Sequence, residues 1–68
     1  MKYLMQWFDC GVCVNSETVS GFTVTEILKG YGVEESASAI LIARMVLGYH
    51  VSIDNCGGYE LLMMKVEG

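Results

Sequence analysis

Three cysteines and one histidine are the residues of this chain best suited to chemistry. Cys10 and Cys13 have the CxxC spacing found in zinc sites, and His50 and Cys56 could complete a set of three thiolates and one imidazole. Both cysteine groups lie in glycine-containing stretches that predict turns. A structural zinc would also stabilise so short a chain. A Cys₃His zinc site formed by these four residues is therefore one alternative.

A purely structural role for the cysteines is the simpler interpretation. The sequence has only one CxxC pair, and nothing in the pattern forces the two predicted turns to the same end of a sheet. Free cysteines commonly pack as small hydrophobic side chains. The Cys10–Cys13 segment, CGVC, also resembles the redox tetrapeptide of thioredoxin, but that motif follows a strand and begins a helix, whereas Asp9-Cys10-Gly11 predicts a β-turn. We therefore expect no cofactor.

Other catalytic sets are missing from the sequence. It has a single histidine, no GxSxG or HExxH motif and no glycine-rich phosphate loop. Glu34 and Glu35 could form an acid/base pair, but adjacent helical residues point about 100° apart. At a helix N-terminus both carboxylates are stabilised by the helix dipole. We therefore expect a protein that is not an enzyme and has no catalytic residues.

Length and charge restrict the remaining classes. The 68 residues predict a single domain, 1–68, with a net charge of −4. Direct nucleic-acid binding is disfavoured because the four basic residues do not cluster. The odd number of cysteines and the short apolar run at the start predict a cytoplasmic protein, and no segment reaches the ~20 apolar residues of a membrane span.

The first half of the chain predicts a strand, a turn and a short helix. Residues 2–8 are aromatic and aliphatic, with Tyr3, Met5 and Trp7 on one face, which predicts a central or covered strand that returns through residues 12–14. Residues 15–21 are polar and predict a loop. Thr23 and Glu26 fit a capping box, flanked by Phe22 and Ile27 as a hydrophobic staple, and Gly30 or Gly32 predicts the helix end.

The second half predicts a longer helix followed by a hairpin. The helix runs from Glu34 to Gly48, residues 49–54 alternate as an amphipathic strand, residues 54–58 form a turn, and residues 59–66 form a strand flanked on both sides. The predicted fold is therefore α+β, with an N-terminal hairpin, two consecutive helices and a C-terminal hairpin in an antiparallel sheet packed by helices. This outline is also compatible with a winged helix.

The long helix carries more apolar residues than one small core can bury. Ala39, Ile42, Ala43 and Val46 form a line suited to packing inward. Because a lone arginine is rarely buried, the side that carries Arg44 is predicted to face outward. The predicted partner-binding residues are those on and near that side: Ile40, Leu41, Arg44, Met45, Glu34 and Glu35.

These observations favour a non-enzymatic protein-interaction module. A small acidic chain with surplus apolar surface suits an inhibitor or adaptor of a larger protein machine, for example a phage-encoded antagonist of host defence or transcription that acts in the host cytoplasm. Its acids would steer it toward a basic, nucleic-acid-binding partner. A homodimer is a further option. The alternatives are a winged-helix nucleic-acid-binding regulator and a small zinc-stabilised Cys₃His domain.

Overall fold

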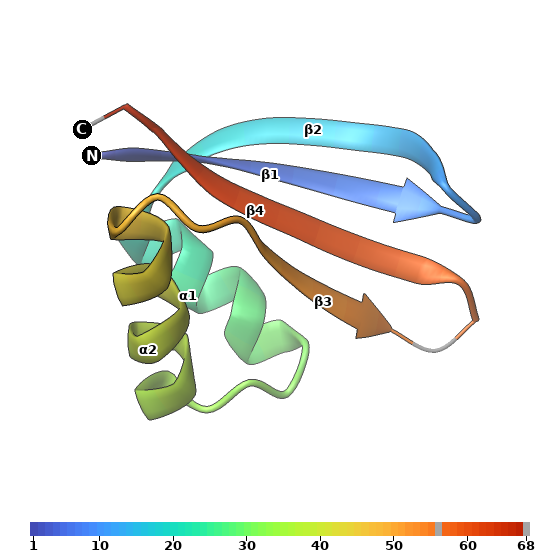
Figure 1. Cartoon of the computed structure of the whole chain (residues 1–68). Helices are drawn as coiled ribbons and strands as arrows, with labels where there is room; N and C mark the ends of the chain where they lie inside the picture. The colour runs from blue at the N-terminus through green and yellow to red at the C-terminus, as the bar shows by residue number, and fades with distance from the viewer. Residues whose placement is uncertain (56, 68) are drawn as a thin grey trace.

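Two β-hairpins enclose a pair of helices in the chain order (Figure 1). The computed structural model describes residues 1–55 and 57–67. The elements in these residues are β1 (Lys2–Asp9), β2 (Val12–Ser20), α1 (Gly21–Gly30), α2 (Glu35–Val46), β3 (Val51–Asn55) and β4 (Tyr59–Glu67). This order confirms the predicted α+β class with an N-terminal hairpin, two helices and a C-terminal hairpin.

The four strands form one antiparallel sheet in the order β2-β1-β4-β3. The two hairpins are joined because β1 pairs with β4, with Met5 opposite Met63 and Trp7 opposite Leu61. Both strands that were predicted to be central are therefore flanked on each side. The C-terminal hairpin belongs to the main sheet through this pairing.

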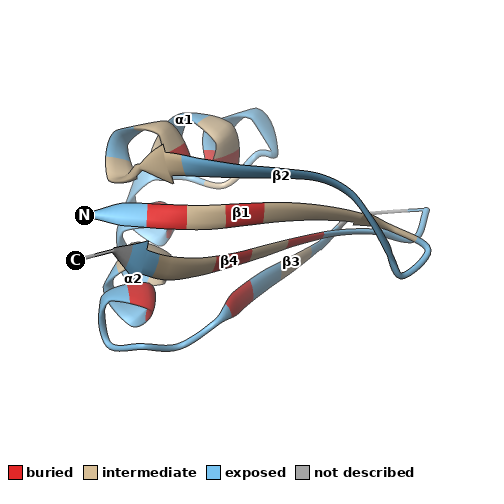
Figure 2. Ribbon diagram, turned by 90° about the horizontal axis from the view of Figure 1, so that it is seen from above, coloured by how far each residue is buried: buried red, intermediate tan, exposed pale blue. Residues whose placement is uncertain are grey.

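Both helices pack on the same face of the sheet (Figure 1). Successive residues of a strand point to opposite faces, so alternate residues of β1 and β4 reach this helical layer. The core consists of buried side chains from five elements: Tyr3, Met5, Val24, Leu28, Met45, Val51, Leu61 and Met63. Figure 2 shows the result, with β1 from residue 3 onward and residues 61–65 of β4 buried or intermediate, and β2 exposed along most of its length.

The predicted loop at residues 15–21 is wrong, because residues 15–20 continue strand β2. Their polar composition reflects the position of β2 at the sheet edge, where residues 12–18 are exposed. These polar residues have little intrinsic preference for a strand, but the backbone hydrogen bonds to β1 hold them in one. The register shifts between Trp7 and Phe8, whose partners are Asn15 and Cys13, so Val14 is an extra residue in a bulge.

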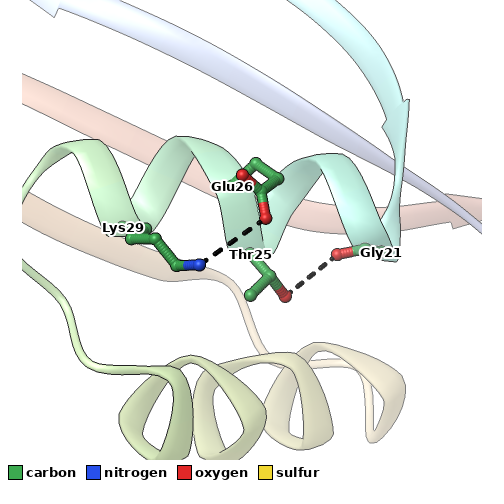
Figure 3. Close-up of polar contacts among 4 residues, drawn as sticks. All are labelled: Gly21, Thr25, Glu26 and Lys29. Carbon is green, nitrogen blue, oxygen red and sulfur yellow. Dashed lines mark hydrogen bonds and ion pairs between the residues drawn. The ribbon is translucent and has the colours of Figure 1, made fainter.

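Helix α1 begins three residues earlier than the capping-box pattern predicts. Its N-cap is Ser20, whose Oγ accepts a hydrogen bond from the Thr23 backbone N–H at 3.3 Å. Glu26 instead lies 3.8 Å from Lys29 Nζ, and Thr25 Oγ1 donates to the Gly21 carbonyl (Figure 3). The helix starts early because β2 extends directly to Ser20. The predicted Thr23–Glu26 capping box is therefore wrong.

The two ends of α1 also differ in how well the pattern located them. Phe22, the predicted staple residue, is 75% exposed on the first turn and is not in the core. At the other end, Gly32 has a φ of +84°, and its N–H donates to the Lys29 carbonyl. The Val33 N–H donates to the Leu28 carbonyl, as in a Schellman motif. The predicted glycine stop is confirmed at Gly32.

Replacing Ser20 with alanine is expected to lower the free energy of unfolding by about 0.5–2 kcal/mol, because the Thr23 N–H loses its acceptor. Chemical denaturation followed by circular dichroism measures this loss. Glu26→Ala is the control, because the only described ion pair of Glu26 is an exposed one with Lys29. A larger loss from Glu26→Ala than from Ser20→Ala would restore the capping box.

The β1–β2 turn places a cysteine in a conformation that favours glycine or asparagine. Cys10 has a φ of +50° and Gly11 a φ of +84°, and a type I′ turn requires positive φ at both central positions.

Cys10→Asn is expected to raise the free energy of unfolding by about 0.5–1 kcal/mol, because asparagine tolerates the left-handed region better. Denaturant titration under reducing conditions checks this. Cys13→Ala, which removes an exposed thiol from the adjoining strand, should change stability by less than about 0.5 kcal/mol.

Candidate functional site

Part of the side of α2 that was predicted to face solvent packs against the core instead. Met45 is 0% exposed and belongs to the core, and Leu41 is half-buried against it. The expectation that these two side chains face solvent is wrong. Residues 44 and 45 are adjacent and point about 100° apart, so Arg44 faces solvent while Met45 faces the core. The long, flexible methionine side chain fills the space between α2 and the sheet.

The other predicted partner-binding residues are accessible. Ile40 is 59% exposed, and Arg44, Glu34 and Glu35 are exposed as well. Ile40, Arg44 and Leu47 have the i, i+4, i+7 spacing of one helical stripe. The predicted inward line is mostly wrong: Ile42 is half-buried against the core, whereas Ala39, Ala43 and Val46 are exposed. Two exposed apolar side chains, Ile40 and Leu47, therefore remain on the solvent side of α2 with Arg44 between them.

The predicted zinc ligands are divided between the two ends of the sheet. The two hairpin turns do lie together, because the Cys10 N–H donates to the Gly58 carbonyl at 2.9 Å. His50, however, precedes β3, and the five residues of that strand place it roughly 16 Å from the turn. Cys56 lies outside the described residues. Within residues 1–55 and 57–67 there is no group of three or more potential ligands that could hold a metal ion.

The largest departure from an ordinary two-layer domain is the sheet face opposite the helices. Leu4 and Phe8 of β1, and Leu62 and Met64 of β4, alternate with the core residues and so lie on this opposite face. We call these four side chains the open face. All four are half-buried by their neighbours in the sheet, while the two helices lie on the other side (Figure 1). A solvated antiparallel face usually carries polar residues.

Short polar side chains border the open face. By register, Ser16 and Thr18 of β2 lie beside β1, and Ser52 and Asp54 of β3 lie beside β4. Gln6 and Glu60 interrupt the apolar residues on the central strands. An apolar centre with a polar rim is the composition of a protein-binding surface. This arrangement provides hydrophobic contact and rim hydrogen bonds, and it has no paired nucleophile and base among its described residues.

Sequence reasoning noticed this surface but did not assign it. The pattern of residues 2–8 and 59–66 shows apolar residues on both sides of each strand, which predicts a covered or central strand. Both strands are central, but the covering on one side is missing from the described chain. The apolar residues on both faces of these strands could have indicated an uncovered apolar surface. The sequence could not show which face is uncovered, because that depends on both helices packing on the same side of the sheet.

None of the described helices is long and apolar enough to cross a membrane. Comparisons of the chain with protein-family models, with curated proteins and with solved structures found no significant match.

Proposed function

We propose that this chain is a non-enzymatic protein-interaction module that binds a larger protein through its open face. The observation that carries the proposal is the placement of both helices on one side of the sheet, which leaves Leu4, Phe8, Leu62 and Met64 without a covering layer from the described chain. Apolar surface of this kind gains free energy when it is removed from water. An inhibitor or adaptor works by occupying a partner's surface in this way.

The open face and its rim are large enough for a specific complex. Four strands spaced by ~4.8 Å, with eight or nine residues on the longer ones at ~3.4 Å each, present roughly 500 Å² in projection. A complex would bury about as much on the partner, so the total is roughly 1,000 Å². That total meets the lower limit for a specific protein–protein interface. Affinity would then depend on the quality of the central side chains.

Charge favours a basic partner over a second copy. The chain has a net charge of −4, and Asp54 and Glu60 lie at one end of the open face. Two copies would bring like net charges together, whereas a basic protein, such as one that binds nucleic acid, would be attracted. Cys10 and Cys13 are exposed free thiols, which suits a reducing compartment such as the cytoplasm. We therefore propose a cytoplasmic inhibitor or adaptor of a basic protein machine.

The test compares charge substitutions on the two apolar surfaces. A tagged chain captures its partner from a lysate of its source cells, and calorimetry then measures the Kd for the purified partner. Leu62→Glu should raise the Kd by about 100-fold or more, because a central apolar contact is replaced by a desolvated charge. Ile40→Glu on α2 is the matched control and should change the Kd by less than about threefold.

The opposite pattern would move the docking surface to α2. If Ile40→Glu abolishes binding and Leu62→Glu does not, the open face is not the interface. Light scattering of the purified chain tests whether the open face instead binds a second copy of the chain. If the chain is a dimer and Leu62→Glu is a monomer, the open face is a contact between copies. Circular dichroism of each variant establishes that the fold is retained.

A further inference from the structure

A small pocket with aromatic walls lies near the ends of the two hairpins. Its volume is about 120 Å³, and its lining includes the rings of Trp7, Tyr31 and Tyr59 together with Ile53 and Leu61. Trp7 packs against the core, so it points to the helical side of the sheet, away from the open face. In Figure 1 the two hairpins extend past the helices, and Tyr31 follows the end of α1. The aromatic rings of the pocket lie on the helical side, but its lining also includes Phe8, Asp54 and Glu60, so the pocket adjoins one end of the proposed docking face.

A hydrogen bond holds two of the three rings in place. Trp7 Nε1 donates to the Tyr31 hydroxyl at 2.7 Å, which connects β1 to the end of α1 across 24 residues of sequence. Trp7 is also half-buried against the core, so its ring has little freedom. Tyr31 is 41% exposed and Tyr59 is 51% exposed, which leaves ring surface available at the pocket mouth. The Trp7 and Tyr31 walls are thus held together before any ligand arrives, which reduces the entropic cost of binding.

The charges around this pocket are negative. Asp54 and Glu60 are among the residues that line it, although their alternation with Ile53 and Leu61 turns both side chains toward the open face, and Asp9 lies opposite Tyr59 in the β1–β4 register. No lysine, arginine or histidine is among the lining residues in the described part of the chain. Aromatic faces attract cations through the ring quadrupole, most strongly when the cation is weakly hydrated. Carboxylates near the pocket add a longer-range electrostatic attraction for the same cation.

We infer that this aromatic pocket binds an organic cation, with a quaternary ammonium or guanidinium head enclosed by Trp7, Tyr31 and Tyr59. The volume of about 120 Å³ suits a head group of this size, since a cavity of about 150 Å³ holds benzene, and it is too small for a drug-sized ligand. The cation could belong to a free small molecule or to an arginine or methylated lysine of another protein. The inference does not rest on the proposed docking of a partner, although the pocket and the open face share Phe8.

The single tryptophan of the chain makes the pocket directly observable. Trp7 fluorescence is titrated with choline and, as a neutral isostere, with 3,3-dimethylbutan-1-ol, at an ionic strength held constant with sodium chloride. Choline should give a saturable change and bind at least about fivefold more tightly than the alcohol, because only choline gains cation–π energy. A parallel titration with N-acetyl-arginine amide shows whether the pocket prefers a quaternary ammonium or a guanidinium head. Tighter binding of either cation than of the alcohol supports the inference that the pocket binds organic cations.

Two tyrosine variants separate ring contact from hydrogen bonding. Tyr59→Leu should weaken choline binding at least about threefold while leaving the alcohol unaffected, because it removes a π-face from an exposed position. Tyr31→Phe retains the ring but loses the hydrogen bond from Trp7, so choline and the alcohol should bind more weakly by the same factor, and the ratio of their affinities should stay within about twofold of that of the unmodified chain. Equal binding of choline and the alcohol, or no saturable change with any cation, would overturn the inference, and neither result would affect partner binding at the open face.

Discussion

Met45→Glu is expected to unfold the chain. Met45 is 0% exposed and joins α2 to the sheet, so glutamate would both vacate its volume and place a carboxylate among apolar side chains. The loss should exceed about 4 kcal/mol. A chain of 68 residues has a free energy of unfolding of only roughly 3–10 kcal/mol. Circular dichroism and one-dimensional NMR of the purified variant would show loss of the cooperative thermal transition.

Ile40→Glu is the matched control on the same helix. Ile40 is 59% exposed, so the same new charge at this position stays in water and should change the free energy of unfolding by less than about 1 kcal/mol. If Ile40→Glu unfolds the chain and Met45→Glu leaves it folded, the inward and outward sides of α2 are the reverse of those described. The pair therefore tests the orientation of the helix with one type of substitution.

Local sequence patterns predicted most elements of this fold. Glycine at positions 32 and 48 has positive φ and ends α1 and α2, respectively, as the pattern predicted. The period-two alternation of residues 49–54 is confirmed from Val51 onward, with Val51 buried and Ser52 exposed. These features depend on one or two residues and their immediate neighbours, so they can be derived before the tertiary structure is known.

The failures share a physical cause, which is competition from tertiary pairing. Residues 15–20 are too polar to predict a strand, yet β1 provides a template and β2 forms along it. That extension brings Ser20 to the start of α1, where it replaces Thr23 as the N-cap. One long-range pairing thus changed both a loop and a helix boundary. Neither effect is contained in the local sequence.

The orientation of α2 could not be derived for a different reason. Its apolar residues surround most of the helix, so periodicity alone does not select an inward side. Arg44 was the only guide, and it correctly predicted its own exposure but not that of Met45. The buried Ser38, whose hydroxyl has no hydrogen-bond partner among the described residues, is a position that polarity would place outside. Polarity therefore did not decide which residues of α2 are buried.

Met63→Ala is expected to cost about 2–5 kcal/mol of unfolding free energy, whereas Met64→Ala should cost less than about 1 kcal/mol. The two methionines are neighbours on β4 and point to opposite faces of the sheet. Met63 is 0% exposed, opposite Met5 and within the core. Met64 is half-buried, opposite Leu4 on the open face. Denaturant titrations of the two variants compare the same deletion on the two sides of one strand.

This pair tests the register of the sheet as well as its packing. A shift of β4 by one residue would exchange the two faces, and Met64→Ala would then be the more destabilising change. The same variants connect stability to the proposed binding. Because Met64 contributes to the open face but not to the core, Met64→Ala should weaken partner binding by about tenfold while the thermal transition remains close to that of the unmodified chain. Unchanged affinity for the partner in Met64→Ala, combined with unchanged stability, would remove this end of the open face from the interface.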